Sequence, residues 1–194
     1  LASTLTYAQE ETETEEAPSF SIAGSIDTYY RSSEYAPGSS FGDLPGFALG
    51  MANIVVSYEG EKSGFVADLV FGPRGTDAVF NSSGSSNIVN QLYAYYNLSE
   101  SFTLTLGNFN TFLGYEVISP VANFNYTTSY MFSYGPFSHT GIKADLAVSD
   151  DISIMLGVLN KTDMTESQPL GEDYMIGVQL GLFGQYINYL GGGT

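Results

Sequence analysis

The sequence has 194 residues, enough for one domain or for part of a larger one, and only 13% of them are charged, about half the share usual in a soluble domain. The net charge of −16 excludes a nucleic-acid partner, because so few basic side chains cannot neutralise a phosphate backbone. The absence of Cys excludes disulfides and thiolate metal sites, and no stretch approaches the ~20 apolar residues of a transmembrane helix.

The beginning of the chain differs from the rest. Residues 1–9 resemble the tail of a secretory signal sequence, with small residues before a cleavage point after Ala8 or Gln9. Residues 10–18 form an acidic segment, in which the like charges between Glu10 and Glu16 repel one another and predict disorder. The folded domain is therefore expected over residues 19–194.

Nine stretches of the remaining chain alternate apolar and polar residues, which predicts β-strands with one apolar and one polar face. The clearest pair runs from Ile142 to Val148 and, after three turn residues, from Ile152 to Val158. Most of these strands are ~9–11 residues long, enough to cross the apolar core of a bilayer at a tilt. In chain order the predicted strands are residues 20–30, 47–58, 64–72, 88–98, 102–108, 141–148, 152–159, 174–182 and 185–190.

The connections between these strands alternate in length. Short turns are predicted at residues 59–63, 99–101, 149–151 and 183–184. Long loops are predicted at residues 31–46, 73–87, 109–140 and 160–173. This alternation is typical of an up-and-down barrel with one tight rim and one elaborate rim, whereas Greek-key connections do not separate loops in this way.

The two predicted faces also differ in chemistry. Small and polar side chains on one face, among them Ser25, Thr105 and Gln179, are too small to fill a narrow interior and predict a wide, wet lumen. Tyr residues near the strand ends, such as Tyr30 and Tyr174, match an interfacial aromatic girdle. The opposite face is apolar and includes Ile22, Ile26, Phe65, Leu69, Leu92, Leu104, Leu106, Ile176 and Leu180.

A soluble β-sandwich or lectin-like domain is the alternative, because such domains also use strands with one solvated face. Low charge and the alternating loop lengths favour a membrane barrel. The predicted fold class is therefore all-β, an antiparallel up-and-down transmembrane β-barrel with about nine strands present. Because bacterial single-chain barrels use even strand numbers, we expect the chain to be the N-terminal part of a larger barrel.

A set of motifs lies around the longest predicted loop. A strand ending in Gly107-Asn108-Phe109 leads to Gly114-Tyr115-Glu116, then to Asn125-Tyr126, and then to Pro136-Phe137-Ser138-His139-Thr140-Gly141. This order resembles the outer-membrane β-barrel porins of the OmpL-like type, common in Bacteroidetes and related Gram-negative bacteria. Val158-Leu159-Asn160 continues the pattern, although Lys161 stands where the family usually has Gly. The resemblance implies a porin in the outer membrane without indicating its solute.

Candidate functional residues are those that project toward the polar face. Asp27, Asp68, Gln91, Lys143 and Asp145 are the predicted pore-lining residues, and their charges predict modest cation selectivity.

The longest loop offers two further candidates. In general porins such a loop folds into the barrel, so Tyr115 and Glu116 are candidates for a constriction. The alternative is structural, with the Gly-Tyr-Glu motif ending the strand and Glu116 held in a hydrogen bond.

Other chemistry has little support in the sequence. Ser138 and His139 are adjacent, but neighbouring residues of a strand point to opposite faces and cannot easily share a hydrogen bond. The acidic pairs Asp150-Asp151 and Glu172-Asp173 lack calcium-loop spacing, and no nucleotide-binding glycine motif is present. We therefore expect neither an enzyme nor a metal or other cofactor.

The predicted function is a porin of the cell outer membrane that allows small hydrophilic solutes or ions to diffuse passively. Its expected partners are outer-membrane lipid, those solutes or cations, and a further copy or a complex in the membrane. Two alternatives stay open: a non-conducting barrel that serves as a structural or binding subunit, and a soluble secreted β-domain that acts as an adhesin or carbohydrate binder.

Overall fold

The computed structural model describes residues 18–36, 38, 41–79 and 81–193. The predictions of a signal-sequence tail and of a disordered acidic segment concern residues 1–17, which lie outside the described residues.

The nine predicted strands are all present in the described residues, which confirms an all-β protein. The strands are β1 (Ser19–Arg31), β2 (Gly46–Glu59), β3 (Ser63–Phe71), β4 (Val89–Ser99), β5 (Phe102–Asn110), β6 (Ser138–Ser149), β7 (Ile152–Leu159), β8 (Met175–Leu182) and β9 (Gln185–Gly192). The loops contain two short helices, α1 (Pro73–Ala78) and α2 (Tyr130–Tyr134), and two 3-10 turns, η1 (Gly84–Ile88) and η2 (Pro120–Ala122). None of the helices in the described ranges is long and apolar enough to span a membrane.

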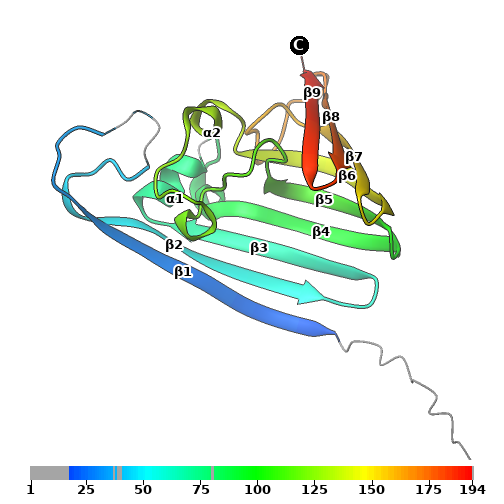
Figure 1. Cartoon of the computed structure of the whole chain (residues 1–194), viewed down its shortest axis with the longest axis horizontal. Helices are drawn as coiled ribbons and strands as arrows, with labels where there is room; N and C mark the ends of the chain where they lie inside the picture. The colour runs from blue at the N-terminus through cyan, green and yellow to red at the C-terminus, as the bar shows by residue number, and fades with distance from the viewer. Residues whose placement is uncertain (1–17, 37, 39–40, 80, 194) are drawn as a thin grey trace, which may run out of the picture.

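The strands form one antiparallel sheet in which each strand pairs with its neighbour in sequence, so the predicted up-and-down topology is confirmed. The sheet is strongly curved and open, with β1 and β9 as the edges of its described part (Figure 1). Short turns join β2 to β3, β4 to β5, β6 to β7 and β8 to β9, and the long loops lie at the opposite end. An open, curved sheet of this topology is what part of a barrel wall requires.

The longest loop is shorter than predicted because the strands on both sides extend into it. The sequence places this loop at residues 109–140, whereas β5 ends at Asn110 and β6 begins at Ser138. The extra pairs join Phe109 to His139 and Asn110 to Ser138. Gly107, with a φ of 136°, pairs with Tyr93 of β4, and a Cβ there would lie 2.2 Å from the carbonyl oxygen of Leu92. The residues at these two strand ends do not alternate between apolar and polar, so the sequence pattern predicts both strands too short at this end.

The sheet has an apolar face and a polar face, as its alternation predicts. Ile26, Leu106 and Leu156 belong to the apolar face and are 81%, 64% and 56% exposed. Exposed aliphatic side chains in rows across paired strands are costly in water but match lipid.

The buried core lies on the polar face, toward the end with the long loops. It joins β2 and β3 to α1 and to the β5–β6 loop, and it consists of Met51, Val70, Ala78, Val79, Ile118, Phe132 and Phe137. In Figure 1, α1 and α2 lie together on one side of the sheet near β2 and β3. The β3–β4 and β5–β6 loops are therefore packed on the sheet.

Candidate functional site

A ladder of hydrogen-bonded polar side chains links the strands from β1 to β6. The Oδ1 of Asn53 on β2 accepts hydrogen bonds from the backbone N–H and hydroxyl of Ser25 on β1, at 2.9 and 2.7 Å. Asp68 on β3 accepts from the side-chain amides of Asn53 at 3.3 Å and of Asn90 at 2.7 Å. Asp68 is buried, so these bonds replace water around its carboxylate.

The ladder continues through β5 and β6 to the next loop. The Asn108 amide donates to the backbone carbonyl of Asn90 at 2.8 Å, and the Thr140 hydroxyl lies 3.0 Å from Asn108 Oδ1. The same hydroxyl lies 3.0 Å from the carbonyl oxygen of Thr165 in the β7–β8 loop. Side chains from β1 to β6 are therefore held in one fixed array.

A hollow of about 410 Å³ opens on the polar face beside this ladder, over β4, β5 and β6. The Nζ of Lys143 forms an ion pair with Asp145 Oδ2 at 2.8 Å and lies 5.3 Å from the centre of the Phe109 ring. The hollow is lined by Tyr93, Tyr95, Thr103, Thr105, Phe109 and Asn110, and by three of the predicted pore-lining residues, Gln91, Lys143 and Asp145. A fourth, Asp68, is the β3 residue paired with Gln91.

Asp27, the fifth predicted pore-lining residue, lies apart from this hollow. Its Oδ2 accepts a hydrogen bond from the hydroxyl of Tyr126, in the β5–β6 loop, at 2.7 Å. Gly50 of β2 leaves the room for this contact, because a Cβ there would lie only 1.7 Å from the same carboxylate oxygen. Burial raises the pKa of the Tyr126 hydroxyl, and the bond to Asp27 raises it further.

A buried arginine fixes the same loop from the other side. Arg74 of α1 is 0% exposed. Its Nε donates to the carbonyl of Ile118 at 2.7 Å and its Nη1 to the carbonyl of Tyr126 at 2.9 Å. The guanidinium also lies 5.4 Å and 5.5 Å from the ring centres of Phe41 and Tyr126, which compensates in part for its burial. Desolvation lowers the pKa of Arg74, while Tyr126 and Asp27 oppose that shift.

The two constriction candidates occupy different environments in the β5–β6 loop. Glu116 is 5% exposed, and its carboxylate accepts from the backbone N–H of Ser129 at 2.8 Å and from the Ser129 hydroxyl. Ser129 in turn caps α2 by accepting from the N–H of Phe132. Tyr115 is 57% exposed, and its ring packs on Phe124 at 5.8 Å. The constriction remains a prediction, whereas the structure gives Glu116 a hydrogen-bonded position at the start of α2.

The loop also reaches the far side of the polar face. Gln179 of β8 donates to the carbonyl of Phe112 at 3.0 Å. Phe112 fits over Gly177, where a Cβ would lie 2.9 Å from the ring, and its own ring packs on His139 at 4.9 Å. The Nε2 of His139 lies 3.0 Å from the Thr111 hydroxyl. The loop therefore contacts the polar face from β1 to β8.

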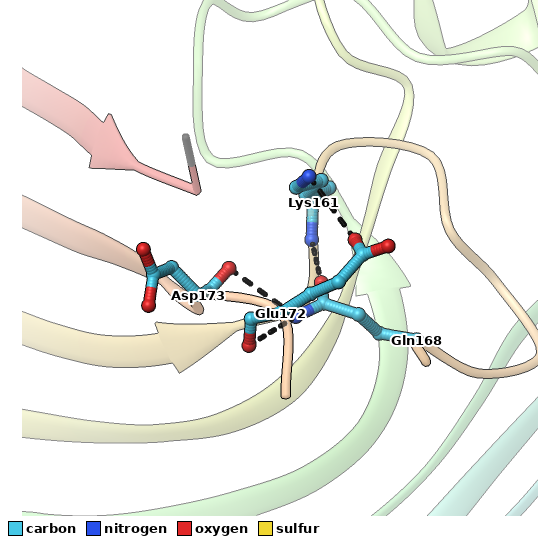
Figure 2. Close-up of polar contacts among 4 residues, drawn as sticks. All are labelled: Lys161, Gln168, Glu172 and Asp173. Carbon is cyan, nitrogen blue, oxygen red and sulfur yellow. Dashed lines mark hydrogen bonds and ion pairs between the residues drawn. The ribbon is translucent and has the colours of Figure 1, made fainter. Parts of the chain in front are cut away.

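Polar contacts among its own residues hold the β7–β8 loop together, as Figure 2 shows. The backbone N–H of Lys161 donates to Gln168 Oε1 at 2.7 Å, and Gln168 donates to the carbonyls of Glu172 and Asp173. Lys161 Nζ also pairs with Glu172 Oε2 at 3.0 Å. Lys161, which stands where the family usually has Gly, therefore connects the two ends of this loop. In the described part of the chain, no group of three or more His, Asp or Glu could hold a metal ion.

Sequence reasoning identified the pore-lining candidates but missed Arg74 and Tyr126 as organising residues. In the sequence, Arg74 was only part of a Gly-Pro-Arg-Gly stretch that indicated a loop. Its hydrogen-bond partners, Ile118 and Tyr126, lie 44 and 52 residues away in sequence. The charge of Arg74, which is one of five basic residues in an acidic chain, was the only signal available in the sequence. Tyr93 and Tyr95 alternate with apolar residues on β4 and could have been assigned to the polar face.

The comparison with family models identifies the class to which this fold and surface belong. The model described as "Putative beta-barrel porin-2, OmpL-like" matches residues 19–193. The chain therefore belongs to this family of porin-like β-barrel proteins, as its motifs predict. Comparisons with curated proteins and with solved structures each found no significant match. Membership of a porin-like family implies a location in the outer membrane.

Proposed function

We propose that the protein is an outer-membrane porin through which small hydrophilic solutes or ions diffuse passively. The observation that carries this proposal is the separation of the two faces of one curved sheet. Exposed aliphatic residues such as Leu106 and Leu156 cover one face, and the ladder around Asp68 covers the other. A wall with lipid on one side and water on the other requires this arrangement.

The long loop provides a means of selection. It reaches Asp27 on β1 through Tyr126 and Gln179 on β8 through Phe112, so it lies across the polar face. A loop anchored at both sides of a lumen narrows it, and lumen width and charge then set which solutes pass. Lys143 and Asp145 line the hollow over β4, β5 and β6.

The test is reconstitution of the purified protein into planar bilayers and liposomes. A porin gives stepwise ionic currents and swelling of liposomes in small neutral sugars, with exclusion of larger ones. Membrane fractionation should place the protein in the outer membrane, extractable only with detergent. Release without detergent would support the soluble adhesin-like domain instead.

The same loop favours one second candidate, a non-conducting barrel that acts as a structural or binding subunit. The supporting observation is the apolar core formed by Ile118, Phe132 and Phe137 with β2 and β3, which fixes the loop in place. Correctly folded protein that inserts in bilayers without any current would favour this candidate over the porin.

A further inference from the structure

The hollow over β4, β5 and β6 has the chemistry of a ligand site. Its volume of about 410 Å³ lies within the ~300–1,000 Å³ of small-molecule pockets. Its lining combines rings from Tyr93, Tyr95 and Phe109 with hydroxyl and amide groups. A plain water-filled wall needs polar groups but has no need of converging aromatic rings.

One ring of this hollow is held in place by a glycine. Gly64 of β3 pairs directly with Tyr95 of β4. A Cβ at Gly64 would lie 2.4 Å from both the ring Cζ and the hydroxyl oxygen of Tyr95. The Tyr95 ring therefore leans over the β3 backbone, a position that a larger residue at 64 would prevent.

Two side-chain amides lie together in the wall of the hollow. The backbone N–H of Asn110 donates to Gln91 Oε1 at 3.1 Å, which leaves the Gln91 amide nitrogen as a donor. The Oδ1 of Asn110 is enclosed by protein, so its amide nitrogen is the group that can face the hollow.

The charges in the hollow indicate a neutral ligand. Lys143 and Asp145 pair at 2.8 Å, so their charges cancel at close range. Each retains hydrogen-bonding capacity for hydroxyl groups, since an ammonium has three donors and a carboxylate several acceptor positions.

We infer that this hollow is a binding subsite for a neutral sugar that passes through the lumen. The apolar face of a sugar ring would pack on Tyr95, and its hydroxyls would pair with Asn110, Gln91 and the Lys143–Asp145 pair. This inference rests on the proposed porin function and adds a solute class to it.

The test measures single-channel current through the reconstituted protein with maltotriose, and with polyethylene glycol of matched size as the comparison. The expected result is a saturable block by maltotriose alone. Tyr95→Ala should weaken the block about tenfold, the fold-change of a strong aromatic contact. Tyr96→Ala is the matched control, because Tyr96 is the next residue of β4 and lies on the opposite face, half exposed.

Tyr95→Phe serves as a second variant that keeps the ring and the fold, and it should leave the block within about twofold of wild type, because the sugar packs on the ring. Equal current reduction by maltotriose and polyethylene glycol, or equal effects of Tyr95→Ala and Tyr96→Ala, would overturn the subsite while leaving the porin intact. Block by a zwitterionic amino acid but not by maltotriose would also overturn it.

Titration calorimetry of maltotriose with the protein in detergent separates this inference from the porin proposal. Sugar binding without any current would contradict the porin proposal and support the sugar subsite. Absence of both current and sugar binding would contradict both proposals.

Discussion

Neighbouring residues of one strand face lipid and water in turn, so the same substitution should destabilise the protein by very different amounts at the two positions. Leu104 and Thr103 are adjacent on β5 and project to the apolar and polar faces. Leu104→Arg places a charge in lipid and should cost ~2–4 kcal/mol if the site lies near the bilayer midplane. Thr103→Arg can reach water and lies opposite Asp145, so its cost should stay below ~1 kcal/mol.

Urea titration of the two variants folded in liposomes measures this difference in the free energy of unfolding. Wild type and Thr103→Arg should unfold at similar urea concentrations. Comparable losses in both variants would mean that the two faces of the sheet are wrongly assigned.

Asp163 provides a titratable anchor in the β7–β8 loop. Its Oδ1 accepts from the backbone N–H groups of Phe137 at 2.7 Å and Ser138 at 3.1 Å. Burial raises the pKa of this carboxyl above its ordinary 3.8, and the two hydrogen bonds oppose that shift only in part. A folded-state pKa above the unfolded one means that Asp163 favours folding most at low pH and less as the pH rises through 3.8 toward the folded value.

Asp163→Asn removes this titration and keeps the accepting oxygen. It also suits the backbone, because Asn tolerates the left-handed conformation found here, with a φ of 60°. The stability of wild type relative to this variant should fall as the pH rises above about 3.8 and then level off. Unfolding in urea at a series of pH values measures it, and a relative stability that rises with pH would contradict the assignment.

At the scale of elements, the β5–β6 loop should act as a removable obstruction on a stable sheet. Each strand pairs with its neighbour, and residues 117–134 take no part in these strand pairs. Deletion of residues 117–134 should therefore leave a folded sheet and raise single-channel conductance. Unchanged conductance in a folded deletion variant would favour a purely structural role for Glu116 and its neighbours.

Tyr126→Phe is the milder version of the same test. It removes only the hydroxyl that donates to Asp27 at 2.7 Å and keeps the ring beside Arg74. The loss of one hydrogen bond, worth ~1 kcal/mol, should increase current fluctuations without opening the lumen fully. Tyr134→Phe is the control, because Tyr134 lies on α2 and is largely exposed. Equal noise in both variants would show that the contact with Asp27 does not hold the loop.

The strands could be predicted from sequence because a strand repeats every two residues and its pattern is local. Strand β7 was predicted with the bounds it has, and other strands within a few residues. The contacts that hold the β5–β6 loop on the polar face could not be predicted, because they join residues far apart in sequence, such as Tyr126 and Asp27, 99 residues apart. Helices α1 and α2 are too short to show a helical period. The hollow also joins residues from three strands, so only the sheet register brings Tyr95 near Lys143.

At the scale of the whole molecule, the net charge of −16 is a poor guide to the charge of the proposed lumen. Only the charges on the polar face can act on a permeating ion, and contacts within the protein partly neutralise some of them. Asp145 is paired with Lys143, and Asp27 is bound by Tyr126. Strand β1 also extends one residue further than predicted, to Arg31, whose guanidinium donates to the carbonyls of Gly42 and Asp43.

Modest cation selectivity remains the expected outcome, because Asp27, Asp68 and Asp145 outnumber Lys143 among the predicted pore-lining residues. Lys143→Gln should strengthen the preference for cations by freeing Asp145, and Asp145→Asn should weaken or reverse it by freeing Lys143. Salt screens such charges over ~10 Å at 0.1 M, so both effects should fade as the KCl concentration rises. Reversal potentials under a KCl gradient measure the selectivity. Opposite shifts in the two variants would support a lumen-facing ion pair, and shifts of the same sign would contradict that ion pair. A wild-type potential that favours chloride would contradict the predicted cation selectivity.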